Sequence, residues 1–188
     1  MKNIVRFSGI SLLAILAITS CKKEKATEEE NDNELITTVE VRVTESGTNN
    51  STTYKWEDID GPGGEDPIIE NITLQPNKTY NVQVGLLDAS QNPPESITSE
   101  IMEESLVHRL YYQPAASSGI TVSGLDTDEN QLPLGLNCSW ATAGFGSGSM
   151  IITLRHYPNG GKEAADPLTS SKSTTDAEVE FPVVVTQP

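Results

Sequence analysis

Apolar side chains recur at every second position in several separate segments of this chain, and this period restricts the possible fold more than any other feature. Successive side chains of a β-strand point to opposite faces, so a period of two indicates strands with one buried face. An amphipathic helix would instead need apolar residues three and four positions apart. The alternating rows are Val39–Val43, Tyr54–Trp56, Tyr80–Leu86, Leu134–Trp140, Met150–Leu154 and Val179–Val185.

Turn-forming residues such as Gly61-Pro62-Gly63-Gly64 separate these rows. Only Pro94–Leu106 has the spacing of a helix, with Ile97 and Ile101 four positions apart. Repeated βαβ units are absent from the sequence, which excludes a parallel nucleotide-binding sheet. Residues 35–188 are ample for one hydrophobic core and barely enough for two, so one domain is expected. We therefore predict one all-β domain, an antiparallel β-sandwich of about 8–9 strands with at most one short helix.

One local motif indicates a particular kind of sandwich. The segment Ile72–Val82 resembles the corner between two strands of fibronectin type III and immunoglobulin-like domains. The resemblance implies that Leu74 and Val82 lie in the core and that Pro76-Asn77 turns the chain. It also implies that the hydroxyl of Tyr80 bonds back to the loop. The expected architecture is therefore an immunoglobulin-like β-sandwich.

The first residues have the pattern of an export signal. Lys2 and Arg6 precede an apolar run, Ile10–Ile18, which is about half the roughly 20 residues that a membrane-spanning helix needs. The following segment, Leu16–Cys21, resembles the lipobox of bacterial lipoproteins. This resemblance implies that residues 1–20 are a cleaved signal peptide and that the Cys21 sulfur carries diacylglycerol. Membrane attachment through this lipid is then expected.

A charged segment, residues 21–34, separates the expected lipid from the expected domain. It contains almost no apolar side chain, so we predict a disordered tether. Small lipoproteins of Bacteroidetes are similar in this segment and along most of the mature chain, and none of their shared motifs has a known chemistry. The resemblance implies an outer-membrane lipoprotein of the cell envelope. It leaves the periplasmic or surface face open and favours the surface.

The charge of the chain narrows the possible partners. Asp and Glu outnumber Lys and Arg by 27 to 12, for a formal net charge of −15 at pH 7. Nucleic-acid binding is not expected, because phosphate contacts need clustered basic residues. With Cys21 lipidated, Cys138 is left without a partner for an internal disulfide.

No pattern in the sequence predicts catalysis. His108 and His156 lie in or beside expected strands, without a neighbouring nucleophile or acid–base motif. Cys138 continues an apolar row, so a buried, inert thiol is expected. Gly144–Gly148 lacks the spacing of a nucleophile elbow. Zinc ligands at short sequence spacing are absent. We therefore predict a protein that is not an enzyme.

Calcium is the one cofactor that the sequence suggests. Asp126, Asp128 and Asn130 place side-chain oxygens at alternate positions of a loop, as a hard cation requires. The loop departs from the EF-hand pattern, because Gln131 stands where a glycine is needed. Acidic turn residues also commonly bond their own backbone, so a simple turn is the alternative. A second acidic group, Glu57–Asp66, allows the same two interpretations.

Aromatic residues and a long loop suggest a glycan or a protein as a possible partner. The alternation places Trp56 and Trp140 in the core, and it favours exposure of Tyr111 and Tyr157. The polar segment from residue 159 to 176 is long for a loop in a compact domain, and such loops are commonly functional or disordered. We therefore predict a non-catalytic binding or interaction module. The alternative is a structural envelope lipoprotein without a small-molecule ligand.

Overall fold

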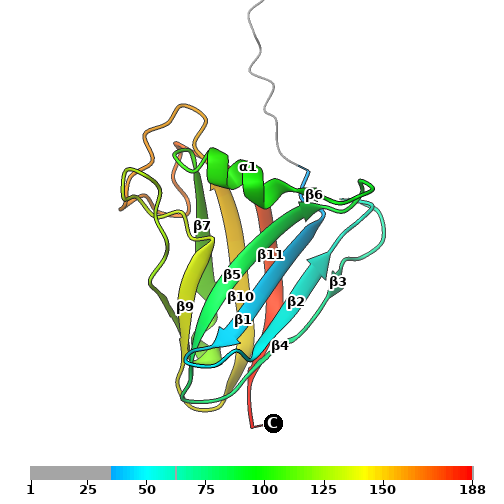
Figure 1. Cartoon of the computed structure of the whole chain (residues 1–188), viewed down its shortest axis with the longest axis vertical. Coiled ribbons are helices and arrows are strands. Elements are labelled where there is room, and N and C mark those ends of the chain that lie inside the picture. The colour runs from blue at the N-terminus through cyan, green and yellow to red at the C-terminus, as the bar shows by residue number, and fades with distance from the viewer. Residues whose placement is uncertain (1–34, 62, 188) are drawn as a thin grey trace, which may run out of the picture. The chain divides into compact units, whose positions relative to one another are not determined.

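The computed structural model describes residues 35–61 and 63–187, which form two β-sheets packed face to face (Figure 1). This arrangement confirms the prediction of an all-β sandwich. The larger sheet has the strand order β3 (Ile68–Ile69), β2 (Ser51–Glu57), β1 (Thr38–Glu45), β5 (Thr79–Asp88), β9 (Asn137–Thr142) and β8 (Ile120–Ser123), with β6 (Glu95–Ser96) paired to β5. The smaller sheet has the order β4 (Ile72–Leu74), β11 (Thr174–Val185), β10 (Gly146–His156) and β7 (His108–Pro114).

The apolar rows of the sequence fill the space between the two sheets. Alternate residues of β1, β5, β9, β10 and β11 are buried in a single cluster, which includes Trp140 and Phe181 with no exposed surface. Large buried side chains of this kind supply most of the hydrophobic stabilisation of a domain. The expectation that Trp140 belongs to the core is confirmed, and Trp56 packs against the core while partly exposed.

The structure contains short strands that the alternation did not indicate. Eleven strands occur in the described residues, against the predicted 8–9, because β3, β4, β6 and β8 have only two to four residues each. Such short segments are too brief to show a period. Leu134 and Leu136 are buried as expected, but they lie in the loop that leads into β9. The pairing of β4 with β11 is parallel, whereas the other strand pairs are antiparallel.

The expected corner between β4 and β5 is present. Leu74 and Val82 are buried, and Asn77 adopts a positive φ of 57° in the turn. The backbone N–H of Gln75 donates a hydrogen bond of 2.8 Å to the hydroxyl of Tyr80. The side chain of Tyr80 therefore satisfies a backbone donor of the loop, as the resemblance implied.

One α-helix occurs in the described residues, α1 (Ile97–Glu103), and it lies across one end of the sandwich (Figure 1). Ile97 and Ile101 lie on its buried face, four residues apart as the sequence indicated. The hydroxyl of Thr98 accepts a hydrogen bond from the N–H of Leu86 and donates one to its carbonyl oxygen, which fixes α1 to β5. A 3₁₀ turn, η1 (Ala116–Ser118), precedes β8.

The predicted signal peptide (residues 1–20), the lipid-bearing Cys21 and the tether (residues 21–34) lie outside the described residues. Among the residues that the structure does describe, none belongs to a helix long and apolar enough to cross a bilayer.

Candidate functional site

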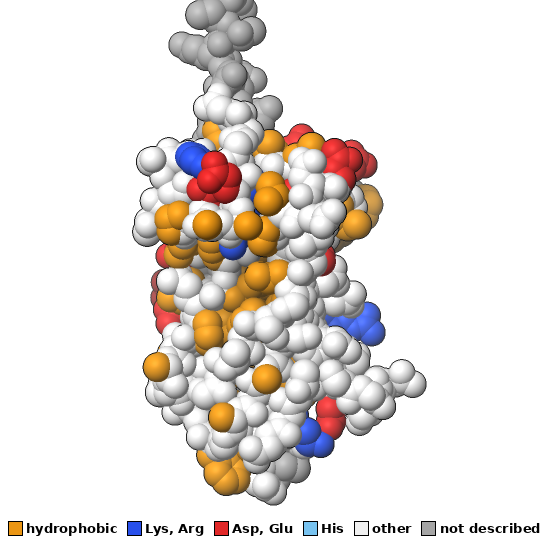
Figure 2. All heavy atoms as spheres, turned by 90° about the vertical axis from the view of Figure 1, so that its left-hand side faces the viewer, with side chains coloured by type: hydrophobic (Ala, Val, Ile, Leu, Met, Phe, Trp, Pro, Cys, Tyr) orange, Lys and Arg blue, Asp and Glu red, His pale blue; other side chains and the backbone are white. Residues whose placement is uncertain are grey.

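The loops next to α1 carry several of the polar residues that are buried in the described part of the chain, namely Asp128, Lys162, Asp166 and Ser170. The loop that precedes β9 (residues 124–136) and the loop between β10 and β11 (residues 157–173) lie at the same end as α1 (Figure 1). Figure 2 shows the side of the sandwich that bears these loops, where hydrophobic side chains gather in the middle and acidic side chains lie near the upper end.

A pocket of about 460 Å³ opens between α1, β5 and the loop that precedes β9. Ligand sites are commonly concave, with apolar walls and a few polar groups that fix orientation. This pocket fits that description, since its lining combines Val84, Met102, Leu134 and Leu136 with the polar Gln83, Asp126, Thr127 and Asn137.

A buried ion pair closes one side of this pocket. Nζ of Lys162 lies 2.8 Å from Oδ2 of Asp128, and neither side chain has exposed surface. The same Nζ donates hydrogen bonds to the carbonyl oxygens of Ser105 (2.7 Å) and His108 (2.9 Å). Lys162 therefore connects the loop between β10 and β11 to the segment that joins α1 and β7.

The pKa values of the two partners follow from burial and pairing. Burial favours the neutral form of Asp128, but the contact with Lys162 and the N–H groups of Leu132 and Asn130 outweigh it, so the pKa of Asp128 is lowered. Burial also lowers the pKa of Lys162, and Asp128 opposes that shift. The negative charge of Asp128 and the positive charge of Lys162 therefore each offset the cost of burying the other.

The residues predicted to bind calcium lie in one loop, where their oxygens already have partners. Asp126 accepts hydrogen bonds from the N–H of Gly135 and from the side-chain amide of Asn137. Oδ1 of Asp128 accepts bonds from the N–H groups of Asn130 and Leu132. These are the backbone bonds of acidic turn residues. A calcium ion would have to compete with Lys162 for Asp128, and calcium binding at Asp126, Asp128 and Asn130 stays a prediction.

The second acidic group surrounds a smaller hollow of about 320 Å³, which Glu57, Asp58, Asp60, Glu65 and Asp66 line. Asp60 accepts a hydrogen bond from the N–H of Glu65, as a turn-forming carboxylate does.

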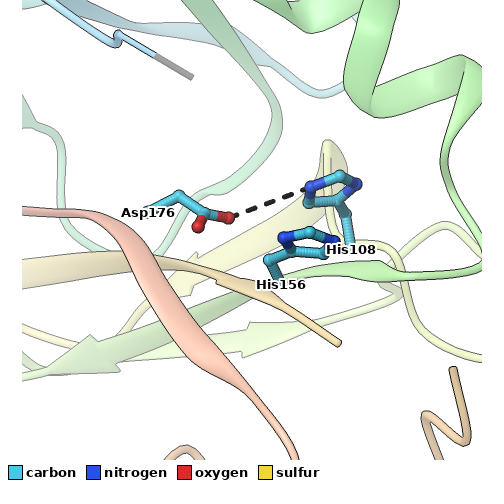
Figure 3. A group of neighbouring side chains, drawn as sticks. All are labelled: His108, His156 and Asp176. Carbon is cyan, nitrogen blue, oxygen red and sulfur yellow. Dashed lines mark ion pairs between the residues drawn. The ribbon is translucent and has the colours of Figure 1, made fainter. Parts of the chain in front are cut away.

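The structure brings together two histidines and an aspartate that lie far apart in the sequence (Figure 3). His108 begins β7, His156 ends β10, and Asp176 lies near the start of β11. His108 and His156 are cross-strand partners, and their rings stack with centroids 4.7 Å apart. Nε2 of His108 points toward Oδ2 of Asp176 at 3.8 Å.

A β-bulge sets the position of Asp176. Leu154 pairs with Ala177 and Arg155 pairs with Thr175, so Asp176 has no cross-strand partner in β10. Bulges of this kind alter the direction of a side chain and are common beside functional sites. The Asp176 side chain is 3% exposed, and neither of its carboxylate oxygens has a hydrogen-bond partner in the described residues.

Burial shifts both titratable groups toward their neutral forms. It lowers the pKa of His108 to about 4, and the nearby His156 and Lys162 act in the same direction, while a backbone hydrogen bond to Glu104 opposes them. Burial raises the pKa of Asp176 to about 6, although His156 and Arg155 lower it. The His108 ring is therefore neutral at pH 7.

This cluster did not follow from sequence spacing, because its members lie on three separate strands. A signal was nevertheless present. His108 has the same parity as the buried Leu110, and His156 continues the buried row of Ile152 and Leu154. Both rings were therefore placed on the core face by the alternation itself.

The cluster does not have the geometry of an acid–base pair that acts on a substrate. The separation of 3.8 Å between His108 and Asp176 is too long for a hydrogen bond. Both side chains are almost fully buried, so a substrate in solvent does not reach them. The expectation that the protein is not an enzyme stays a prediction.

The aromatic residues considered for glycan stacking are less available than predicted. Tyr157 has no exposed surface, so the expectation of its exposure is wrong. Its hydroxyl lies 2.7 Å from that of Tyr111, which also donates to the carbonyl oxygen of Asp166. Tyr111 is half-buried, and the guanidinium of Arg109 lies over its ring at 4.3 Å. These tyrosines hold the long loop against β7.

Cys138 is buried on β9 of the larger sheet, as the apolar row indicated. Burial raises the pKa of its thiol to about 11, although contacts with Tyr112 and Trp140 lower it. A thiol in this state is a poor nucleophile.

Comparisons of this chain with protein-family models, with curated proteins and with solved structures find no match.

Proposed function

We propose that this protein is a lipid-anchored envelope lipoprotein whose β-sandwich is a non-catalytic binding module. The observation that supports a binding role is the pocket of about 460 Å³ beside α1, with apolar walls and converging polar groups. Hydrogen bonds keep the walls of this pocket in place. Thr98 attaches α1 to β5, and Lys162 bonds to the segment that follows α1. A pocket that is already formed lowers the ordering cost of binding.

The polar groups of the pocket indicate the chemistry of its ligand. Asp126 accepts one hydrogen bond at each oxygen, and a carboxylate oxygen can accept a second one. Gln83 and Asn137 add amide groups at the same wall, and Val84, Leu134 and Met102 supply apolar surface. We propose a small ligand with one apolar face and several hydroxyl or amino donors, as in a sugar. The net charge of −15 favours ligands that are neutral or cationic.

The proposed membrane attachment depends on the sequence of the first 21 residues. An apolar run that ends in a small-residue segment before Cys21 supports lipid modification at that sulfur. The proposal predicts that labelled palmitate is incorporated into the wild-type chain and is absent from Cys21→Ala. Protease digestion of intact and lysed cells then distinguishes the surface, which we favour, from the periplasm.

The immunoglobulin-like identity of the sandwich is part of the same proposal. The hydrogen bond between Gln75 and Tyr80 supports it, since this corner is typical of such domains. The parallel pairing of β4 with the last strand, β11, is a feature that any assignment of topology has to include.

The alternative is a structural envelope lipoprotein without a small-molecule ligand. The observation in its favour is that Asp126 and Asp128 already bond to groups of their own loop, and that Asp128 also pairs with Lys162. Acidic groups that are already paired within the protein have a sufficient structural role, which is to hold the loops together, and they need no ligand.

A ligand screen with a blocked pocket separates the two functions. The full chain in mild detergent is titrated with a panel of monosaccharides, short oligosaccharides and primary amines, and binding is followed by NMR. Thr127→Trp places an indole at the pocket, and Thr121→Trp is the matched control, because it makes the same change at an exposed site on β8. We expect at least one member of the panel to bind the wild type and the control but not Thr127→Trp. Binding that survives in Thr127→Trp, or no binding by any compound, would contradict the proposal.

A further inference from the structure

We infer that His108, His156 and Asp176 form a binding site for one divalent transition-metal ion, with zinc as the best match. The site is separate from the pocket of the proposed function, and nothing in the inference depends on a ligand there. Two imidazole nitrogens and a carboxylate oxygen are a ligand set that zinc uses when a water molecule completes its coordination.

The hydrogen bond at the far side of the His108 ring determines which nitrogen faces the site. Nδ1 of His108 lies 3.1 Å from the backbone carbonyl oxygen of Glu104. A carbonyl oxygen only accepts, so Nδ1 must carry the proton in the neutral ring. Nε2 then presents a lone pair toward Asp176. Metal-binding histidines are commonly oriented in this way, by a backbone carbonyl at the other nitrogen.

The opposing group is an acceptor as well. Oδ2 of Asp176 faces Nε2 of His108 at 3.8 Å, and both carboxylate oxygens are buried without a hydrogen-bond donor. Two acceptors that face each other in a buried place are unfavourable unless an electrophile lies between them. The separation is too long for a shared proton. A metal ion between the two atoms satisfies both of them.

The distances are close to those of a zinc site. Zinc bonds of about 2.0–2.2 Å at tetrahedral angles place two ligand atoms about 3.4 Å apart. The ligand atoms of all three side chains lie within 4.8 Å of one another. Closing this geometry needs a rotation of the partly exposed His156 ring out of its stack on His108, and a movement of Asp176 in its bulge. Figure 3 shows Asp176 directed at His108, with the His156 ring stacked against the His108 ring.

The surrounding charge permits a cation. Lys162 contacts the backbone of His108, but its charge is compensated by Asp128 at 2.8 Å. Asp176 supplies one negative charge directly, and the chain as a whole is strongly acidic. Because the ligands lie at the ends of β7, β10 and β11, a bound ion connects the two strands that flank the loop of residues 157–173. Metal binding should therefore stabilise the folded state.

The test measures metal binding directly. The full chain is stripped of metal with a chelator in mild detergent, dialysed against zinc and analysed for bound metal by mass spectrometry. We expect one zinc ion per chain and a rise in Tm. Cobalt in place of zinc should give the visible absorption of a four-coordinate ion, which aqueous cobalt lacks.

Variants identify the ligands. Asp176→Asn and His156→Gln should each weaken zinc binding by about tenfold or more and abolish the cobalt spectrum. Glu180→Gln is the matched control, because it removes one carboxylate charge from an exposed position on the same strand, β11, and should leave both readouts unchanged. Circular dichroism checks that each variant folds, and His156→Gln alters the more exposed ligand in case Asp176→Asn does not fold. No stoichiometric zinc in the wild type, or equal binding in folded ligand variants, would overturn the inference. The variant Thr127→Trp should keep its zinc, which separates this test from that of the pocket.

Discussion

The two ends of the sandwich are stabilised by different chemistry. At one end, neutral groups close the corner between β4 and β5, where Gln75 donates to Tyr80 and Lys78 donates its N–H to the hydroxyl of Thr142. At the other end, beside α1, charged or titratable groups are buried, namely Lys162 with Asp128 and His108 with Asp176. Neutral hydrogen bonds are lost at a modest cost, whereas an uncompensated buried charge is expensive. The α1 end should therefore be much more sensitive to substitution.

The largest expected effect is at the buried ion pair. Lys162→Met leaves Asp128 charged and buried without its partner, so the free energy of unfolding should fall by about 3–5 kcal/mol. Denaturation by urea measures this change.

The matched control for this prediction lies at the opposite end. Lys78 pairs with Glu45 near the corner, with 40% and 23% of their side chains exposed. Lys78→Met should change stability far less, because solvent screens the pair. If Lys162→Met and Lys78→Met lowered the free energy of unfolding equally, the proposed difference between the two ends would be wrong.

A smaller effect is expected at the corner itself. Tyr80→Phe keeps the buried ring and removes the hydroxyl that accepts from Gln75, so we expect a loss of about 1–2 kcal/mol. Tyr54→Phe is the comparison, since its hydroxyl donates to Thr73 at a more exposed place and should matter less. Thermal and urea unfolding of both variants give the values. A loss at Tyr80 as large as that at Lys162 would show that the corner is not the more tolerant end.

A still smaller global effect is expected where the long loop is fixed to β7. Arg109 donates to the carbonyl oxygens of Glu163, Ala164 and Asp166. Arg109→Lys keeps the charge but loses the planar fork that reaches several acceptors. We expect little change in Tm and faster hydrogen exchange within residues 157–173. Unchanged exchange in this loop would mean that other contacts hold it.

The smallest expected effect is in the core of the sandwich, at Cys138 on β9. The buried thiol of Cys138, with its pKa raised to about 11, should react with a thiol reagent at pH 8 only after unfolding. Reaction of the folded protein at the rate of a small-molecule thiol would contradict the burial. In Lys162→Met the reaction should become faster, because the unfolded state is more populated.

The same contrast explains what could be predicted from the sequence. The corner and α1 were predictable because their contacts join residues that lie close in the chain, as Gln75 and Tyr80 do. The buried polar pairs beside α1 were not predictable, because they join Asp128 with Lys162 and His108 with Asp176 across different loops and strands. Lys162 lies in a polar segment without period, and such a residue is indistinguishable from a solvated one until the chain is folded.

The sequence did carry one indication of the histidine cluster, which is the position of each histidine in the alternation of its strand. The alternation placed His108 and His156 on the core face, where an unpaired histidine is unusual, and it could not indicate the bulge that directs Asp176 toward them. A single inserted residue reverses the parity of everything beyond it. The expected exposure of Tyr157 was wrong for a different reason. Tyr157 follows directly after β10, where the alternation of the strand no longer applies, and it is buried there.

The parallel pairing of β4 with β11 has a kinetic consequence. Ile72–Leu74 finds its partner only in Val183–Val185, at the far end of the described chain. The smaller sheet therefore cannot be completed until residues 183–185 are present, and its closure joins contacts of high sequence separation, which are slow to form. A chain delivered with its N-terminus first should keep the smaller sheet open and accessible to chaperones and proteases until β11 arrives.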